Sequence, residues 1–201
     1  MLVGAATAFA SGNNYALKLT SADQGVARAI AIRRADLRPA THWSGGLTKP
    51  DLSTATCAGY RPKTSDLVIS GAAESDWTRP DRILGNQVEI FQTTQMMELD
   101  WKRAVSLAGV TCTLTKAGAK NVAVSAVAFP AAAPHVAGYR ATYSLVQDGK
   151  TVRQAFEIVA VARGRAEISV AEFVRDPGLL TSVHADLVRL AGVLAGRAAK
   201  T

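Results

Sequence analysis

The stretch YRATYSLVQDGKTVRQAFEIVAVARGRAEISVAEFV, residues 139–174, decides the fold. It contains three apolar runs separated by two tight connections, and such runs are typical of β-strands. The first connection, Gln147-Asp148-Gly149-Lys150, is a strong hairpin signal because Asp-Gly tolerates the positive φ angles of a two-residue turn. The second connection is Arg163-Gly164-Arg165. The sequence therefore predicts three consecutive antiparallel strands, over residues 139–147, 151–162 and 166–174.

Further strands and helices are expected on either side of this stretch. Alternating apolar residues predict strands, whereas apolar residues at helical spacing predict helices. The additional strands are expected at 66–74, 87–92 and 121–129, and the helices at 20–34, from Thr93 or Thr94 to Val105, and at 178–198. Hairpins combined with separate helices indicate an α+β fold. We expect a single antiparallel sheet of about six strands, packed by two or three helices.

Composition divides the chain into four parts, and we expect one domain overall, over residues 20–201. Between residues 37 and 65 the sequence is rich in Gly, Pro, Ser, Thr and Asp and has little periodicity, which predicts a long loop. The four parts are a signal-like apolar segment at 1–10, an N-terminal helical part at 11–36, the loop at 37–65 and an α+β core at 66–201.

The first residues resemble the remnant of an export signal. Leu2 to Phe9 is apolar, and Ala8-Phe9-Ala10 has the small-x-small pattern of a signal peptidase site, which places cleavage before Ser11. The alternative is an alanine-rich arm. We expect an exported protein, extracellular or in the cell envelope, and the rest of the sequence predicts no transmembrane span.

The chain has two cysteines, Cys57 in the predicted loop and Cys112 just beyond a predicted helix. An even number of cysteines in an exported chain favours a disulfide. We therefore expect a Cys57–Cys112 bridge; the alternative is two unrelated thiols in a cytosolic protein.

Charge and nucleophile patterns give no catalytic or metal site. The chain carries 23 basic and 16 acidic residues, a net charge of +7 that suits either anionic surroundings or ordinary solubility. His42, His135 and His184 lie in unrelated contexts, and there is neither a Gly-x-Ser-x-Gly elbow nor a Cys-x-x-Cys pair. We expect no cofactor and no nucleic-acid binding. Strand carboxylates are expected to pair with neighbouring arginines; they are Glu157, Glu167 and Glu172, with Arg153, Arg163 and Arg165 as candidate partners.

Three runs carry a resemblance to a known group of proteins: SDLVISG at 65–71, TQMMELDWKR at 94–103 and RGRAEISV at 163–170. They resemble actinobacterial exported proteins of unknown role, and the layout over about residues 50–198 is similar to the PsbP-like α/β/α sandwich and to the extracellular sensor domains of mycobacterial serine/threonine kinases. The resemblance implies the fold and an exported location, and it defines no functional residue.

The combined hypothesis is a non-enzymatic exported or envelope domain that binds a small ligand, an envelope polymer or a protein partner. Its binding surface is expected between the sheet and the 37–65 loop, near Trp43, Tyr60 and Arg61. Two alternatives stay open. One is a hydrolase with a dispersed site, such as His135 with a strand glutamate, and the other is a cytosolic interaction module.

Overall fold

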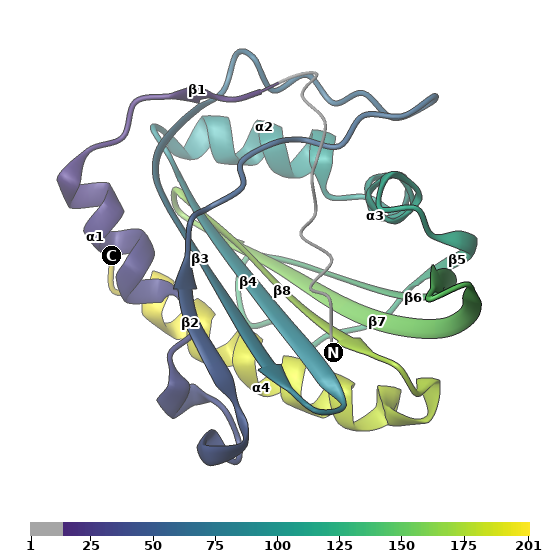
Figure 1. Cartoon of the computed structure of the whole chain (residues 1–201). Helices are drawn as coiled ribbons and strands as arrows, with labels where there is room; N and C mark the ends of the chain where they lie inside the picture. Colours follow the sequence, from purple (N-terminus) through teal and green to yellow (C-terminus); the bar gives the residue numbers. More distant parts are fainter. Residues whose placement is uncertain (1–13) are drawn as a thin grey trace.

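The computed structural model describes residues 14–201, which form a twisted sheet with helices on both of its faces (Figure 1). The main path of the sheet runs in the order β1-β3-β4-β8-β7-β6-β5, and β2 pairs with β3 beside this path. The strands are β1 (Ala16–Leu17), β2 (Ser44–Thr48), β3 (Val68–Arg79), β4 (Arg82–Phe91), β5 (Lys120–Ala126), β6 (His135–Gln147), β7 (Lys150–Arg163) and β8 (Ala166–Val174).

The α+β class is confirmed, but the expectation of one antiparallel sheet of about six strands is wrong. The sheet has eight strands and is mixed, because β1 pairs with β3 in parallel. The two unpredicted strands both pair with β3 at the edge of the sheet. β1 has only two residues, and β2, whose sequence is Ser-Gly-Gly-Leu-Thr, lacks apolar alternation. Both strands are defined by their backbone pairing with β3, and neither has the alternation of apolar and polar side chains from which a strand is predicted.

The six strands expected from the sequence are present, and most are longer than predicted. The two tight connections lie where the sequence places them: β6 and β7 pair up to Gln147 and Lys150, and β7 and β8 up to Arg163 and Ala166. Asp148 has a φ of 50° and Gly149 a φ of 73°, as an Asp-Gly hairpin requires.

In the described part of the chain four α-helices cover the sheet: α1 (Ser21–Ile30), α2 (Thr94–Ala104), α3 (Leu107–Lys116) and α4 (Leu180–Ala198). Helix α4 packs on β7 and β8, and α1 packs on β3, β4 and α4. Helices α2 and α3 lie on the other side of the sheet, away from α4 (Figure 1). Short 3₁₀ turns occur at Arg34–Asp36, Ala40–His42 and Pro177–Leu179.

Helix α3 is a correction to the expected two or three helices. Cys112 follows the predicted helix, now α2, as expected, and it lies within α3. Its run of threonines disfavours a helix on propensity. Two of these threonines donate to backbone oxygens four residues earlier, Thr111 to Leu107 and Thr115 to Thr111. The Ser106 hydroxyl accepts from the Gly109 N–H and caps the helix.

The main core lies between the sheet and the α1/α4 layer. The apolar stripe of α4 packs against apolar side chains of β4, β7 and β8. Within the described part of the chain, Pro177–Ala198 is a helix long and apolar enough to cross a membrane, and here its stripe is buried in this core. The buried stripe residues are Val183, Leu187, Leu190, Ala191, Leu194, Ala195 and Ala198.

The predicted Cys57–Cys112 disulfide is present, with a Cα–Cα distance of 5.8 Å. It joins the segment between β2 and β3 to helix α3 across 55 residues of sequence. The predicted signal-like segment at 1–10 and the cleavage site before Ser11 lie outside the described residues.

Replacing both cysteines by serine is expected to lower the free energy of unfolding by about 4 kcal/mol, because the bridge restricts the unfolded chain. For a domain of this size the melting temperature should fall by roughly 10 °C. Thermal unfolding of the double variant, with and without reductant, measures this. Equal melting temperatures for the wild type with and without reductant would contradict it, provided that thiol titration shows the bridge to be reduced.

Candidate functional site

A partly open cavity of about 820 Å³ lies on the face of the sheet opposite α4. Its floor is formed by strands β3, β4, β6, β7 and β8, and its walls by α2, α3 and the segment between β2 and β3. The strand alternation creates this floor. Along β8, Ile168, Val170 and Val174 are buried in the α4 core, whereas Glu167, Ser169, Ala171 and Phe173 line the cavity.

One half of the floor is polar. It is formed by β3, β4 and the first part of β8, where the cavity-facing side chains include Glu74, Gln87, Glu89 and Glu167. Glu89 and Glu167 occupy directly opposite positions on neighbouring antiparallel strands. Above them Asp100 of α2, which is almost fully buried, accepts a hydrogen bond of 2.9 Å from the Tyr15 hydroxyl. The polar half therefore brings together three carboxyl groups from three elements.

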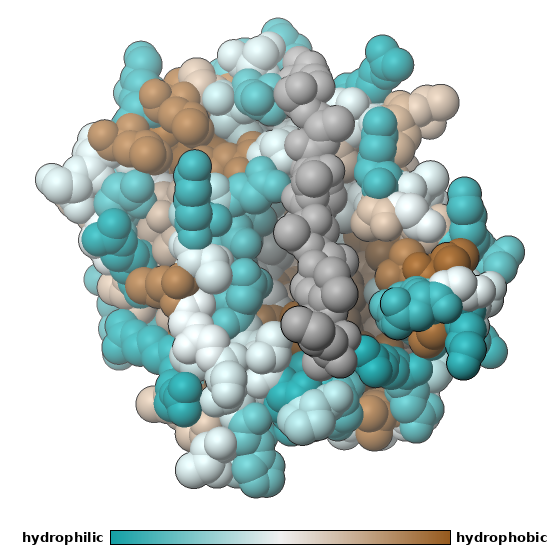
Figure 2. All heavy atoms as spheres, viewed as in Figure 1, coloured by the Kyte–Doolittle hydropathy of each residue, from teal (hydrophilic) through white to brown (hydrophobic). Residues whose placement is uncertain are grey.

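The other half of the cavity is apolar and aromatic. Phe156 of β7 and Phe173 of β8 stack with ring centroids 5.1 Å apart, and Tyr143 of β6 meets Phe156 edge-on. Val110 and Leu114 of α3 pack against the same cluster. Figure 2 shows apolar residues gathered on the side of the molecule where α3, β6 and β7 lie. The polarity of the cavity thus changes from one side of the sheet to the other.

The segment between β2 and β3 covers the polar half and is held down by named contacts. The Asp51 N–H donates to Glu74 Oε2 at 2.8 Å, and the Gln87 side-chain amide donates to the Asp51 carbonyl at 2.9 Å. Further along, the disulfide ties Cys57 to α3, and the Tyr60 hydroxyl donates to the Ala104 carbonyl at 2.8 Å. This segment is therefore an ordered wall of the cavity.

Burial and mutual repulsion act on the three carboxyl groups in the same direction. Burial and the nearby Asp100 charge raise the pKa of Glu89 to about 8. Burial, with Asp100 and Glu89 nearby, raises the pKa of Glu167 well above its usual value. Burial also raises the pKa of Asp100 to about 6, against the opposing effects of the Tyr15 hydrogen bond and the Arg103 charge. The cluster therefore retains protons at a pH where exposed carboxyl groups have lost them.

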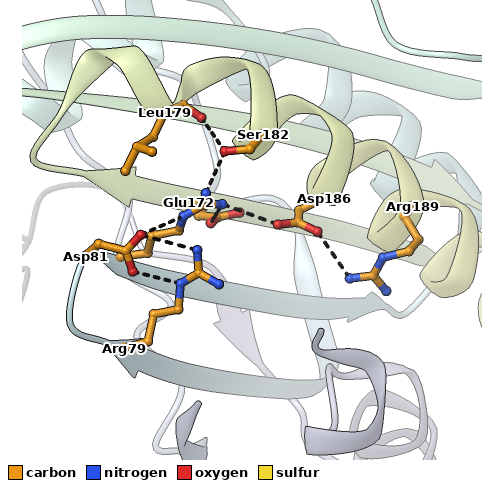
Figure 3. A network of polar contacts seen from close by, with 8 residues as sticks. Arg79, Asp81, Glu172, Leu179, Ser182, Asp186 and Arg189 are labelled. Carbon is orange, nitrogen blue, oxygen red and sulfur yellow. Dashed lines mark hydrogen bonds and ion pairs between the residues drawn. The ribbon is translucent and has the colours of Figure 1, made fainter. Parts of the chain in front are cut away.

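Carboxylates on the α4 face have cationic partners instead. Figure 3 shows Glu172 and Asp186 within one polar network. Both pair with the buried Arg82, whose Nη1 lies 2.8 Å from Glu172 Oε1 and 3.3 Å from Asp186 Oδ2. Glu157, also fully buried, pairs with Arg140 at 2.6 Å and with His184 at 2.5 Å. By contrast, none of the ion pairs formed among residues 14–201 includes Glu89, Asp100 or Glu167.

The arginine partners predicted for the strand glutamates were wrong. The expectation placed Arg153, Arg163 or Arg165 beside them, but Arg165 pairs with Asp23 of α1 at 2.7 Å. The cause is geometric, because neighbours in sequence at the strand ends do not face the buried glutamates across the sheet.

The three residues predicted to bind ligand do not come together. Tyr60 lines the cavity, and burial raises its pKa to about 12. Trp43 is 3% exposed and lies in the core on the opposite face, with the Arg79 guanidinium 5.0 Å from its ring centre. Arg61 is exposed and does not line the cavity.

The histidines are dispersed, as the sequence indicates. His135 Nε2 lies 2.8 Å from Glu98 of α2, and its ring centre lies 5.3 Å from that of Trp101. His184 pairs with the strand glutamate Glu157 on the α4 face. Among residues 14–201 no group of three His, Cys, Asp or Glu side chains could hold a metal ion.

Sequence reasoning missed Glu89 and Asp100 as cavity residues, and it treated Glu167 as an ion-pairing residue. A usable signal was present in the strand pattern. Glu89 alternates with Val88 and Ile90, and Glu167 with Ala166 and Ile168, so each glutamate belongs to the face opposite the apolar core. What the pattern does not contain is the register that sets the two strands side by side.

Stability should fall as the pH rises through the range in which the carboxyl cluster loses its protons. The pKa of Glu89 is about 8 in the folded chain and about 4.5 when exposed, so between these values the folded state binds more protons than the unfolded state. The free energy of unfolding then decreases with increasing pH. Glu89→Gln should reduce this decrease by about 2 kcal/mol between about pH 5 and pH 8.

Urea unfolding at a series of pH values measures this slope. The charges that face Glu89 are those of Asp100 and Glu167, so Asp100→Asn should flatten the slope further. Asp148→Asn, which removes an exposed carboxyl from the hairpin turn, is the matched control. Equal slopes for wild type and Glu89→Gln would show that Glu89 titrates as an exposed group.

The free energy of unfolding should respond differently to substitutions at Trp43, which lies in the core, and at Tyr60, which lines the cavity. Trp43→Ala is expected to lower the free energy of unfolding by about 3–5 kcal/mol, because it empties space in the core. Tyr60→Phe removes only the hydrogen bond to the Ala104 carbonyl and should cost about 1 kcal/mol. Denaturant unfolding gives both values, and wild-type stability of Trp43→Ala would place Trp43 outside the core.

Comparison with known proteins does not identify a family for this geometry. No family model and no curated protein matches the chain. The likeness to actinobacterial exported proteins, and to PsbP-like and kinase-sensor domains, therefore stays a prediction from the sequence.

Proposed function

We propose that the protein is a non-enzymatic, exported binding protein that holds a small ligand in the cavity between the sheet and the α2/α3 side. The observation that carries the proposal is the cavity itself, with a volume of about 820 Å³. Small-molecule sites in proteins have volumes of about 300–1,000 Å³. Well-packed interiors, in contrast, leave few voids larger than a water molecule.

The construction of the walls supports a binding role. The floor comes from five strands of one sheet, and the covering segment is tied to α3 by the disulfide. Aromatic and aliphatic side chains form most of one half, and a few polar groups converge in the other. Sites of this kind combine apolar contact area with a small number of polar groups that fix the orientation of the ligand.

The export part of the proposal rests on the disulfide together with the N-terminal sequence pattern. The chain contains a Cys57–Cys112 disulfide. Disulfides form and persist mainly in proteins of oxidising compartments. The cytosolic alternative requires the same two residues to be free thiols. Thiol titration of protein taken from its native cells therefore distinguishes the two locations.

The geometry favours binding over hydrolysis. The hydrolase alternative pairs His135 with a strand glutamate, but the ring of His135 bonds to Glu98 of α2. The strand glutamate with a histidine neighbour is Glu157, which also binds Arg140. In both pairs a carboxylate bonds to the histidine ring. The hydrogen bonds described for the two rings include no hydroxyl or thiol that either histidine could activate as a nucleophile.

An environment-sensitive apolar dye tests the cavity directly. We expect 1-N-phenylnaphthylamine to bind with a rise in fluorescence at about one dye per chain, because the aromatic half offers a dry surface. Ala171→Trp, which fills the apolar half from β8, should reduce dye affinity by at least about tenfold.

Ala123→Trp is the matched control, because Ala123 is exposed on β5 and lies outside the cavity wall. It should leave dye binding unchanged. The proposal fails if the wild type binds no dye, or if both tryptophan variants bind it as well as the wild type does while keeping their fold.

A further inference from the structure

We infer that the ligand is an amphiphile whose polar head donates hydrogen bonds and carries no negative charge, and whose apolar tail lies along the aromatic half of the cavity. This inference rests on the proposed function, since it specifies what the cavity binds. Two kinds of head share this chemistry, an ammonium group and a group rich in hydroxyls.

The distribution of charge over the molecule is the first argument. Although the chain has 23 basic and 16 acidic residues, seven of the acidic residues line the cavity and only three of the basic ones do. The three basic residues are Lys49, Arg82 and Arg175. Of these, Arg82 is already paired with Glu172 and Asp186 on the α4 side. A net positive protein thus presents an acidic cavity.

The second argument is the arrangement of the acceptors. Glu89 and Glu167 face each other directly across β4 and β8, where like charges destabilise a sheet. Among residues 14–201 one side-chain donor, the Gln87 amide at 2.9 Å, reaches Glu89 Oε1. A ligand head that brought donors to this pair would stabilise the two carboxyl groups in their ionised form, whereas an anionic head would oppose their ionisation.

Unpartnered polar atoms in the walls point to a ligand independently of charge. Glu167 Oε2 is buried and has no hydrogen-bond partner among residues 14–201. Thr54, which is nine-tenths buried in the wall above the polar half, leaves its hydroxyl equally unpartnered within that range. Buried polar atoms without partners are uncommon in proteins, because each loses its hydrogen bonds to water on folding. Donors on a bound head would satisfy both.

The apolar half provides for the tail. The stacked pair Phe156 and Phe173 continues the floor from Ser169 and Ala171, so a ligand whose head reaches Glu167 has its next atoms over aromatic surface. Val110 and Leu114 of α3 close this half from above. A head without a tail would leave these walls in contact with water, and an apolar tail that covers them favours binding.

Three ligands with the same decyl tail test the head. Decylamine, decyl glucoside and decanoate are each added to the full chain below their micellar concentrations. Their affinities are measured by how well each competes with 1-N-phenylnaphthylamine for the cavity. We expect decylamine, decyl glucoside or both to bind at least about tenfold more tightly than decanoate. The stronger of the two identifies the head as an ammonium or a hydroxyl-rich group.

The double variant Glu89→Gln/Glu167→Gln should reduce this preference to less than about threefold, because the amide pair removes the anionic acceptors. Asp148→Asn removes an exposed carboxyl and should keep the preference. Decanoate binding as tightly as the other two would overturn the inference about the head while leaving the cavity a binding site. If neither the dye nor any decyl compound binds, the proposed function fails, and the inference fails with it.

Discussion

The pleat of the sheet is the constraint on which the rest of the molecule depends. Because successive side chains of a strand point to opposite faces, each strand contributes to two environments at once. On β8, Val170 completes the core beneath α4, while its neighbours Ser169 and Ala171 line the cavity. The same alternation places two glutamates of this strand in different environments. Glu172 lies on the α4 face beside Arg82, and Glu167 lies on the cavity face without an ion-pair partner in the described chain. A shift of one residue in the register of β8 would exchange the two faces, so the core and the cavity are specified together.

The second face of the sheet remains open because its covering layer is thin and tied at few points. Helix α4 spans the first face with a continuous apolar stripe, whereas α2 and α3 are shorter and contact mainly β4, β8 and β5. The segment between β2 and β3 supplies the rest of the wall, and it is too polar to be held by burial alone. Hydrogen bonds to Glu74 and Gln87 and the disulfide to α3 hold it instead. The disulfide therefore also fixes one wall of the cavity.

The sequence predicts the part of the fold that local pattern encodes. Strands β6 to β8 follow from alternation and from an Asp-Gly turn whose φ angles the structure confirms, and the disulfide follows from cysteine number. Strands β1 and β2 could not be predicted, because they are formed by pairing with β3 and have no pattern of their own. Helix α3 was missed because threonine-rich stretches have low helix propensity. The cavity required register as well: that Glu89 lies opposite Glu167, and that Trp43 and Tyr60 lie on different faces, are tertiary facts.

The acidic cavity in a basic protein is the feature on which the proposed binding role depends most. The chain has 23 basic and 16 acidic residues, so there are enough cations to pair with every carboxylate. Stability alone would favour such pairing wherever a carboxylate is buried. On the α4 face this is achieved, where Glu157 and Glu172 are each paired. In the cavity Glu89, Asp100 and Glu167 have no such cationic partners among residues 14–201, and burial raises the pKa of Glu89 to about 8.

A group with so perturbed a pKa reduces stability at neutral pH, and such costs are concentrated at functional sites. Replacing the cluster by apolar residues would stabilise the fold and fill the polar half. The position of the cluster opposite an aromatic wall is therefore what supports the proposed ligand, whose head would supply the missing donors.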